Sequence, residues 1–473
     1  MSDTTPPEVT IPLASWVEQL TLDAIPERVA TRAKHLLLDG VACALVGAQL
    51  PWSRTATAAV LDLEGAGEMS VIGTGATTSG PAAVLLNSTF IQGFELDDFH
   101  PLAPLHSNSL ILPVLLAAAQ QYGGAPGAAA LTAAVAGYEV GPRVGLALHG
   151  GEMLARGWHS GPVFGTHTAA MTAGKLRGLG TGLLEDALGM AGTQSGGLMA
   201  AQYEAMSKRM QHGFAARNGY YAAGLAAGGY TGIKRVFDRP YGGYLAVFGE
   251  GHNPDAAQVV AGLGEIWHTE VIMVKSYAAQ GGLHGTIQAA LELRAEHRID
   301  PKSIAHIEIR VGQTVYSHGW WEPERPLTSI GAQMNLGYAA SVALLDGAVM
   351  PPQFTEQRLD ADDVWELLHK VEVKLDQNIQ NGPARERYAT ELTITLHDGT
   401  VLDKRIVEPH GGPSDPVTND DLIAKYRALA GPLLTTERLD AIARTILGLE
   451  ELSDIRELAE LLSAPVAGAL DGK

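Results

Sequence analysis

Residues 94–109 concentrate titratable side chains between two segments that consist mostly of Ala, Gly, Leu and Val. The stretch reads FELDDFHPLAPLHSNS, and its titratable residues are Glu95, Asp97, Asp98, His100 and His106. Imidazoles beside carboxylates suit general acid–base catalysis, because histidine titrates near neutral pH and a carboxylate can orient or tune it. The segment is therefore a candidate for one wall of an active site.

Four further stretches place imidazoles, cations or a phenol among glycines and other small residues. They are GWHSGPVFG with His159, MSKRMQHGFAARNG with Lys208, Arg209, His212 and Arg217, VKSYAAQGGLHG with Lys275 and His284, and NLGYAASVALLDG with Tyr338. Acids, imidazoles and cations in such segments together indicate proton transfer on an anionic substrate.

Each of these residues also has a purely structural interpretation. Asp97 or Asp98 could cap the helix that follows, since carboxylates stabilise helix N-termini. His159 could be a hydrogen-bonded core histidine and Tyr338 a core side chain. Lys208 could belong to a solvated helix face. Only convergence of these side chains in space would favour the catalytic interpretation.

Charge and composition restrict the possible partners. The formal net charge of −19 argues against nucleic acid, and an anionic substrate would need local cations such as Lys208 and Lys275. A hydrophobic content of 46% with 18% charged residues is typical of a soluble globular protein, and no apolar run is long enough to span a membrane. The N-terminal residues lack the basic start and apolar run of a signal peptide, which predicts a cytoplasmic protein.

The sequence contains no clear motif for a metal or an organic cofactor. A single cysteine, Cys43, excludes a Cys-based metal cluster and an intrachain disulfide. His100 and His106 are six residues apart, a spacing too loose to predict a metal site. The Gly-rich segments GTHTAAMTAGKLRG and GLGTGLL lack the spacing of nucleotide-binding loops. We therefore expect neither a cofactor nor a bound metal.

Most of the chain has the pattern of helices. Apolar residues recur at three- and four-residue spacing from about residue 11 to 267, and again beyond Pro409. Thr418 with Asp421 predicts the start of one of the last helices, because this pair can form a capping box. The many Ala and Gly positions allow helices to pack closely.

An intervening segment has a different pattern. IAHIEIRVG (304–312) and ATELTITLHDGTVLDKRIV (389–407) alternate apolar and polar residues, as half-buried strands do. The Asp-Gly pair inside the second stretch is a strong hairpin signal. Residues 331–347 and 363–373 between them read as helices. These patterns together predict an α+β unit.

The predicted fold is mainly α with an α+β insertion. Residues 1–267 and 410–473 would form one large helical domain, and residues 268–409 a smaller α+β lid domain. A cleft between two such domains is a usual place for a small-molecule site.

Several stretches resemble the motifs of the MmgE/PrpD family. They are ELDDFHPLAPLHSNSLILP, KRMQHGFAARNG, VKSYAAQGGLHG and YAASVALLDG, which occur in the family's order over nearly the whole chain. The resemblance implies the same architecture of a large helical domain from both termini with an inserted lid. RAKHLLLDGVACALVGAQLPWS and GWWEPERPLTSIGAQM are more similar to the decarboxylases of the family than to its dehydratases.

The resemblance implies a cofactor-independent carboxy-lyase that converts cis-aconitate to itaconate and CO2. It assigns catalysis to His106, His159 and Lys208, with Asp97 and Asp98 orienting or tuning the imidazoles. Which of Glu95, Asp97 and Asp98 takes the acidic role is left open. The substrate-binding residues that the resemblance implies are His212, Lys275, His284, Tyr338 and Gln280. Relatives are homodimers, so a homodimer is expected.

Two alternatives remain at this point. Gln280 departs from the Cys or His of the family's decarboxylases, so the reaction could instead be dehydration or epimerisation of a related polycarboxylate. A helical binding protein without activity is the alternative from another class. Intact His106, His159 and Lys208 argue against it.

Overall fold

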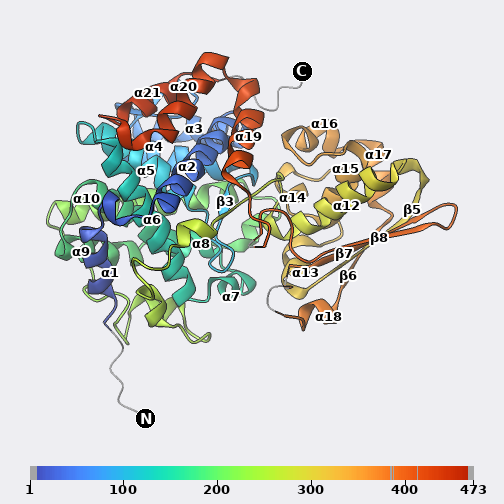
Figure 1. The fold of residues 1–473 in the computed structure, drawn as a ribbon, viewed down its shortest axis with the longest axis horizontal. Helices are drawn as coiled ribbons and strands as arrows, with labels where there is room; N and C mark the ends of the chain where they lie inside the picture. Colours follow the sequence, from blue (N-terminus) through green and yellow to red (C-terminus); the bar gives the residue numbers. More distant parts are fainter. Residues whose placement is uncertain (1–7, 384–385, 387, 413, 467–473) are drawn as a thin grey trace, which may run out of the picture.

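The computed structural model describes residues 8–383, 386, 388–412 and 414–466. Figure 1 shows a helical part formed by both ends of the chain and, beside it, a part that contains a four-stranded sheet. The fold is therefore mainly α with a smaller α+β insertion, as the sequence predicts. The limits of the two domains stay a prediction, and the first and last seven residues of the chain lie outside the described part.

The N-terminal helices pack around α8. Their bounds are α1 (Thr10–Gln19), α2 (Glu27–Gly47), α3 (Pro51–Glu64), α4 (Gly80–Ile91), α5 (Asn108–Gln121), α6 (Gly127–Ala147), α7 (Gly150–Ala155), α8 (Ser160–Leu176), α9 (Thr181–Gly192), α10 (Gln211–Ala227) and α11 (Tyr244–Phe248). Helix α8 contacts α5, α6, α9 and α10. Glycines permit the closest approaches: a Cβ on Gly219 of α10 would lie 2.4 Å from the Thr166 carbonyl oxygen of α8. The Gly- and Ala-rich composition thus serves helix packing.

The stretch from residue 228 to 267 is less helical than its sequence pattern predicts. It contains only α11 and the short 3-10 helix η5 (Ala256–Val259) as helices. Glycines with positive φ interrupt it, among them Gly229, Gly242 and Gly262. Glycine adopts the left-handed region easily and destabilises helices, so turns replace the expected helix here.

The C-terminal helices return to the N-terminal ones. They are α19 (Asn419–Ala430), α20 (Thr436–Leu447) and α21 (Arg456–Ser463). Helices α19 and α20 pack on α2, and α21 packs on α5. Thr418 and Asp421 form the predicted capping box at the start of α19. Both ends of the described chain therefore share one helical core, visible in Figure 1 as red helices lying on blue ones.

The α+β part is built on a mixed sheet with the order β6-β5-β7-β8. The strands are β5 (Ile304–Val311), β6 (Val371–Leu375), β7 (Thr390–Leu396) and β8 (Val401–Ile406). Strand β5 pairs with β6 in parallel and with β7 antiparallel, and β7 pairs with β8 through the predicted hairpin, where Gly399 has a φ of 88°. The helices of this part are α12 (His284–His297), α13 (Gln313–Gly319), α14 (Ser329–Ala332), α15 (Leu336–Asp346), α16 (Glu356–Leu359), α17 (Asp362–Leu368) and α18 (Gln377–Gln380).

Strand β6 was expected to continue a helix. Helix α17 ends at Leu368, and Val371–Leu375 forms the edge strand beside β5. Val371, Val373 and Leu375 alternate with charged residues, but this alternation is too short to be separated from the preceding helical pattern. Parallel pairing with β5, far away in sequence, decides the local structure.

Two short ribbons complete the fold. Strand β1 (Met69–Ser70) pairs with β2 (Thr77–Thr78), and β3 (Asp98–Phe99) pairs antiparallel with β4 (Met273–Val274). The second ribbon joins the acidic-histidine segment to the start of the α+β part. It therefore brings the two segments that carry Asp97 and Lys275 side by side.

No single helix in the described part of the chain is long and apolar enough to cross a membrane. Helices α2 and α3 meet the criteria of length and composition only as a pair, which is bent by 85° at the break between them. In the structure α2 packs against α4 and α19.

Candidate active site

Glu95 lies at the centre of a buried cluster of cations. Its Oε1 accepts hydrogen bonds from Lys208 and Arg209 of η4 (Met206–Met210), and its Oε2 accepts one from Lys275 Nζ at 2.9 Å. Glu95 has a φ of 54°, in the left-handed region that few non-glycine residues adopt, so the network holds a strained backbone position. Three cationic side chains thus meet at one point in a protein of net charge −19. This is the local positive cluster that an anionic substrate requires.

The two lysines of the cluster differ in their pKa values. Burial lowers the pKa of the Lys208 amine to about 8, against the opposing effect of Glu95. Burial also opposes the charge of Lys275, but Asp97 and Glu95 together outweigh it and raise the pKa of Lys275. Lys275 is therefore a fixed cation, whereas Lys208 titrates close to physiological pH.

Asp97 connects the cations to an imidazole. Its Oδ1 accepts a hydrogen bond from Lys275 Nζ at 2.9 Å, and its Oδ2 lies 3.0 Å from Nδ1 of His106. The second contact has the distance of an ion pair but not the geometry of a hydrogen bond. Burial would raise the pKa of Asp97, but His106 and Lys275 outweigh burial and lower it. Asp97 is therefore an ionised partner for His106.

Asp98 has a different position from Asp97. Its two carboxylate oxygens lie 3.0 and 3.2 Å from the backbone nitrogen of Asn108, the first residue of α5. Burial and then the charge of Asp97 raise the pKa of Asp98 well above its usual value, which favours the neutral acid. The capping interpretation thus describes Asp98, and its predicted catalytic role finds no contact with an imidazole in the described part of the chain.

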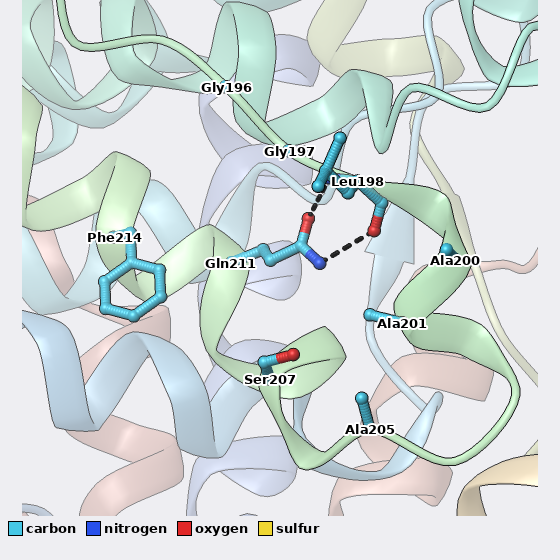
Figure 2. Close-up of a pocket in the computed structure, with 9 residues that line it drawn as sticks. All are labelled: Gly196, Gly197, Leu198, Ala200, Ala201, Ala205, Ser207, Gln211 and Phe214. Carbon is cyan, nitrogen blue, oxygen red and sulfur yellow. Dashed lines mark hydrogen bonds between the residues drawn. The ribbon is translucent and has the colours of Figure 1, made fainter.

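His159 stands directly before α8, and its Nδ1 lies 3.0 Å from Oε1 of Gln211 at the start of α10. Figure 2 shows the amide of Gln211 held on both of its polar atoms by the backbone of Leu198. Burial and then the charge of Lys208 lower the pKa of His159 well below its usual value. These surroundings favour the neutral imidazole of His159.

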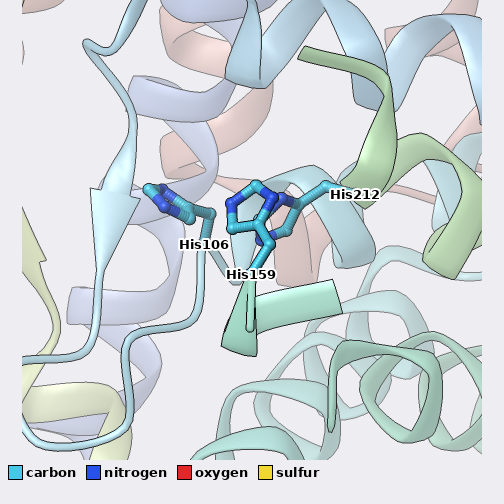
Figure 3. Close-up of side chains that lie close together, drawn as sticks. All are labelled: His106, His159 and His212. Atoms are coloured by element: carbon cyan, nitrogen blue, oxygen red, sulfur yellow. The ribbon is translucent and has the colours of Figure 1, made fainter. Parts of the chain in front are cut away.

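His106, His159 and His212 form a cluster of three imidazoles (Figure 3). The ring centres of His106 and His159 lie 4.8 and 5.0 Å from that of His212, both in edge-to-face arrangement. Both nitrogens of His212 are buried without a hydrogen-bond partner among the described residues, so they are available to a ligand. A Cβ on Gly161 of α8 would lie only 2.6 Å from His212 Nε2, so the cluster requires glycine at that position.

The three clustered histidines are also a possible metal-ligand set. One nitrogen of each lies within 4.8 Å of the others. Burial lowers the pKa of both His159 and His212, and the positive charge of Lys208 adds to this effect and disfavours a further cation between them. His100 faces His268 instead, with 3.3 Å between their nitrogens, so it does not add to this set. The absence of a resident metal stays a prediction.

Gln280 and His284 lie further along the segment that carries Lys275. Gln280 Oε1 accepts a hydrogen bond from the Gly282 backbone, while its buried Nε2 has no partner among the described residues. His284 Nε2 lies 3.1 Å from the Ala279 carbonyl oxygen, and burial lowers the pKa of His284 to about 4. Gln280 therefore offers a hydrogen-bond donor to a ligand, and His284 is a neutral histidine engaged with the backbone.

Tyr338 is not brought to the imidazole cluster. Its hydroxyl donates a hydrogen bond to the Gln353 carbonyl, and its ring lies 5.7 Å from that of Phe354. Phe354 in turn packs edge-on against Phe94, at 5.7 Å, directly before Glu95. Burial raises the pKa of Tyr338. The observed contacts are those of a supporting side chain, and its substrate-binding role stays a prediction.

A surface pocket of about 460 Å³ lies beside the cluster rather than at it. It is lined by Gly196, Gly197, Leu198, Ala200, Ala201, Ala205, Ser207, Gln211 and Phe214. None of the predicted site residues belongs to this lining. Lys208, His159 and His212 are 3%, 4% and 0% exposed, whereas the side chain of His106 is 14% exposed. His106 is therefore the most accessible of these four side chains.

Three polar contributors escaped the sequence-based prediction of the site. Arg209 was noted beside Lys208 in the sequence, but no catalytic or binding role was predicted for it. Gln333 joins both parts of the fold, because its Nε2 donates hydrogen bonds to the carbonyl oxygens of Phe94 and Ala278 at 2.8 and 3.0 Å. Its Oε1 accepts one from Arg209 at 2.6 Å. Gln211, which contacts His159, is the third, and no titratable signal marks either glutamine in the sequence.

Buried cations and imidazoles from distant segments define a two-domain helical protein suited to a carboxylate substrate and to proton transfer. The chain belongs to the MmgE/PrpD family: residues 12–256 match the MmgE/PrpD N-terminal domain and residues 277–451 the C-terminal domain.

Similar proteins cover almost the whole chain. A cis-aconitate decarboxylase-like protein, oryM, from Aspergillus oryzae is 43% identical over 98% of this chain and 99% of its own length. A cis-aconitate decarboxylase from Aspergillus terreus is 41% identical over 98% of this chain and 97% of its own length. The cis-aconitate decarboxylase of Homo sapiens is 27% identical over 97% of this chain and 95% of its own length.

Proposed function

We propose that the protein is a carboxy-lyase that converts cis-aconitate to itaconate and CO2. The observation that carries the proposal is the buried meeting of Lys208, Arg209 and Lys275 with the imidazoles of His106, His159 and His212. Cations bind carboxylates, and imidazoles transfer protons near neutral pH. Relatives named as cis-aconitate decarboxylases, at 41% identity over nearly the full length, support the same assignment.

The reaction needs both kinds of side chain. The bond between the CH2 carbon of cis-aconitate and its carboxylate breaks, and CO2 leaves. The released electron pair forms a new double bond to that CH2 carbon, while the former alkene CH carbon takes up one proton to give itaconate. Negative charge develops next to a remaining carboxylate before the proton arrives. A nearby ammonium group such as that of Lys208 stabilises this charge.

His106 is the best-placed proton donor in this proposal. The ionised carboxylate of Asp97 lies 3.0 Å from Nδ1 of His106, where it can orient the ring for proton transfer. His159 is held neutral by burial and by Lys208. The two histidines therefore differ in their surroundings: His106 lies beside a carboxylate, whereas His159 lies beside a neutral amide.

The proposal requires no cofactor, because cations for charge stabilisation and imidazoles for proton transfer are supplied by the chain itself. Purified protein treated with a chelator is incubated in turn with cis-aconitate, 2-methylcitrate and iminodisuccinate, and products are followed by proton NMR. Itaconate formed from the first compound alone supports the proposal. A dehydration or epimerisation product from either of the others assigns one of the alternative reactions instead. Unchanged spectra in all three would refute an enzymatic role on these substrates.

A cytoplasmic homodimer is the assembly we propose. Phe214, Tyr221 and Leu225 lie seven and four residues apart along α10, on one stripe of the helix, and each is about two-fifths exposed. Leu198, 68% exposed, lines the same surface pocket as Phe214. Exposed apolar side chains gathered on one face are typical of subunit contacts. Light scattering tests the mass: a monomer at micromolar concentration contradicts this assembly, whereas a dimer that Leu225→Lys dissociates supports it.

A further inference from the structure

The amide of Gln211 has a fixed orientation. Its Oε1 accepts a hydrogen bond from the Leu198 backbone N–H at 2.9 Å, and its Nε2 donates one to the Leu198 carbonyl at 2.9 Å. A backbone N–H can only donate and a carbonyl can only accept, so these two bonds determine which end of the amide is the oxygen. That oxygen is the atom 3.0 Å from His159 Nδ1.

An amide oxygen accepts hydrogen bonds and donates none. A neutral His159 can satisfy this contact only by carrying its proton on Nδ1, which leaves Nε2 with its lone pair. We infer that Gln211 is a positioning residue that holds the proton of His159 on Nδ1 and so makes Nε2 the nitrogen that exchanges a proton with the substrate. The part of this inference that concerns the substrate rests on the proposed function; the position of the proton does not.

The surroundings of His159 favour its neutral form. Only the neutral ring has two tautomers, because the protonated ring carries hydrogen on both nitrogens. Lys208 from η4 and His106 from the segment before α5 act on His159 with their charges, the ring of His212 from α10 lies 5.0 Å away, and the carboxylate of Glu95 acts in the opposite direction. His159 also stands at the N-terminus of α8, where the helix dipole disfavours a positive charge. Burial and Lys208 lower its pKa, and the contact with Gln211 offsets part of this effect.

The loop that holds Gln211 is itself built against His159. The His159 backbone N–H donates to the Gly197 carbonyl at 3.1 Å. A Cβ at Gly197 would lie 2.8 Å from the His159 carbonyl oxygen and 3.0 Å from Gln211 Oε1. A Cβ here would therefore require the His159 backbone or the Gln211 amide to shift. Glycine at 197 is thus part of the same positioning device.

The position of the proton can be observed directly in the full-length protein. Nitrogen-15-labelled histidine shows, in long-range proton–nitrogen NMR correlations, which ring nitrogen carries hydrogen, and His159→Asn identifies the His159 signals. At pH 7.5 without substrate we expect a protonated Nδ1 and an unprotonated Nε2. A proton on Nε2 would overturn the inference whatever the enzyme's substrate proves to be.

Two substitutions then test the consequence for catalysis. Gln211→Met removes the acceptor at similar length, and we expect kcat to fall by about 10²-fold with little change in KM, since a wrong histidine tautomer costs up to about 10⁴-fold in serine proteases. Gln211→Glu keeps an acceptor and adds a negative charge that raises the pKa of His159. We therefore expect the proton on Nδ1 to remain and the acidic limb of the kcat profile to move to higher pH.

Gln194→Met is the matched control. Gln194 also hydrogen-bonds backbone carbonyls, those of Met190 and Asn218, but does not contact His159, so we expect normal kcat and an unchanged pH profile. A purely structural role for Gln211 would lower the amount of folded enzyme without moving the pH profile, and that result overturns the inference. If the wild-type protein leaves cis-aconitate unchanged while NMR shows the expected tautomer, the proposed function fails and the positioning of His159 stands.

Discussion

Neutralising Glu95 is the strongest single perturbation of the cation cluster. Glu95→Gln preserves shape but removes the charge that three cations share, and none of these four side chains is more than 4% exposed. Removing one partner of a buried ion pair costs about 3–5 kcal/mol, because the remaining charge stays buried without compensation. We expect the free energy of unfolding to fall by about that amount, a large share of the roughly 5–15 kcal/mol of a typical domain.

The same substitution has a predictable effect on pH dependence. Glu95 raises the pKa of Lys208 against the effect of burial, so its loss takes that pKa below the present value of about 8. More Lys208 is then uncharged at pH 7.5, and the basic limb of kcat/KM moves to lower pH. Urea unfolding followed by tryptophan fluorescence, together with initial rates of itaconate formation between pH 6 and 9, measures the two effects.

Glu139→Gln is the matched control for this experiment. Glu139 is fully buried, pairs with Arg143 at 3.5 Å and accepts a hydrogen bond from the Thr269 backbone at 2.9 Å, but it lies outside the cation cluster. The Glu139→Gln variant should be less stable than the wild type, but its folded fraction should keep the wild-type turnover and pH profile. If Glu95→Gln remained within about 1 kcal/mol of the wild type and kept the same basic limb, our account of the cation cluster would be wrong.

Three further predictions follow from the same geometry. In the wild type, kcat/KM should decline as pH rises through about 8, because Lys208 then loses the charge that binds carboxylate. Lys208→Met should lower kcat/KM by about 10²-fold or more at pH 7. A pH profile of the wild type that stays flat up to pH 10 would contradict this role of Lys208. Asp97→Asn should reduce kcat by about 10²-fold. Asp98→Asn mimics a neutral capping acid, so its kcat should stay within a few-fold of the wild-type value. Equal losses of kcat in the two variants would refute the division of roles between Asp97 and Asp98. Gly161→Ala should displace His212, from which its Cβ would lie 2.6 Å, and lower turnover more than thermal stability; unchanged steady-state rates would show that this contact relaxes freely.

Periodicity in the sequence predicts the fold class well, because apolar spacing directly records which face of an element is buried. The Asp-Gly hairpin and the capping box at Thr418 are local signals and are confirmed in the structure. The strand Val371–Leu375 was missed because its pairing with β5 is non-local. Between residues 228 and 267 the glycines with positive φ interrupt the helix that the apolar spacing predicts.

The candidate site was predictable where a titratable side chain marks it. His106, His159, His212, Lys208 and Lys275 were selected by residue type, and the structure gathers them around the segment that follows α4. Their roles in catalysis remain predictions. Gln333 and Gln211 could not be predicted, because their importance lies in hydrogen bonds to backbone atoms, and no spacing in the sequence records which backbone a glutamine amide will meet. The assignment of Asp98 to helix capping likewise required coordinates.

If the α+β part moves outward to admit a substrate, the short ribbon of β3 and β4 would couple that movement to the assembly of the reactive groups. One of its strands directly follows Asp97, and the other directly precedes Lys275 at the point where the chain enters the α+β part. Swinging that part outward to admit a molecule would unzip this short pairing and draw the lysine away from its two carboxylates. An open molecule would then be chemically incomplete, and swinging back would restore the ammonium group while shutting out bulk water.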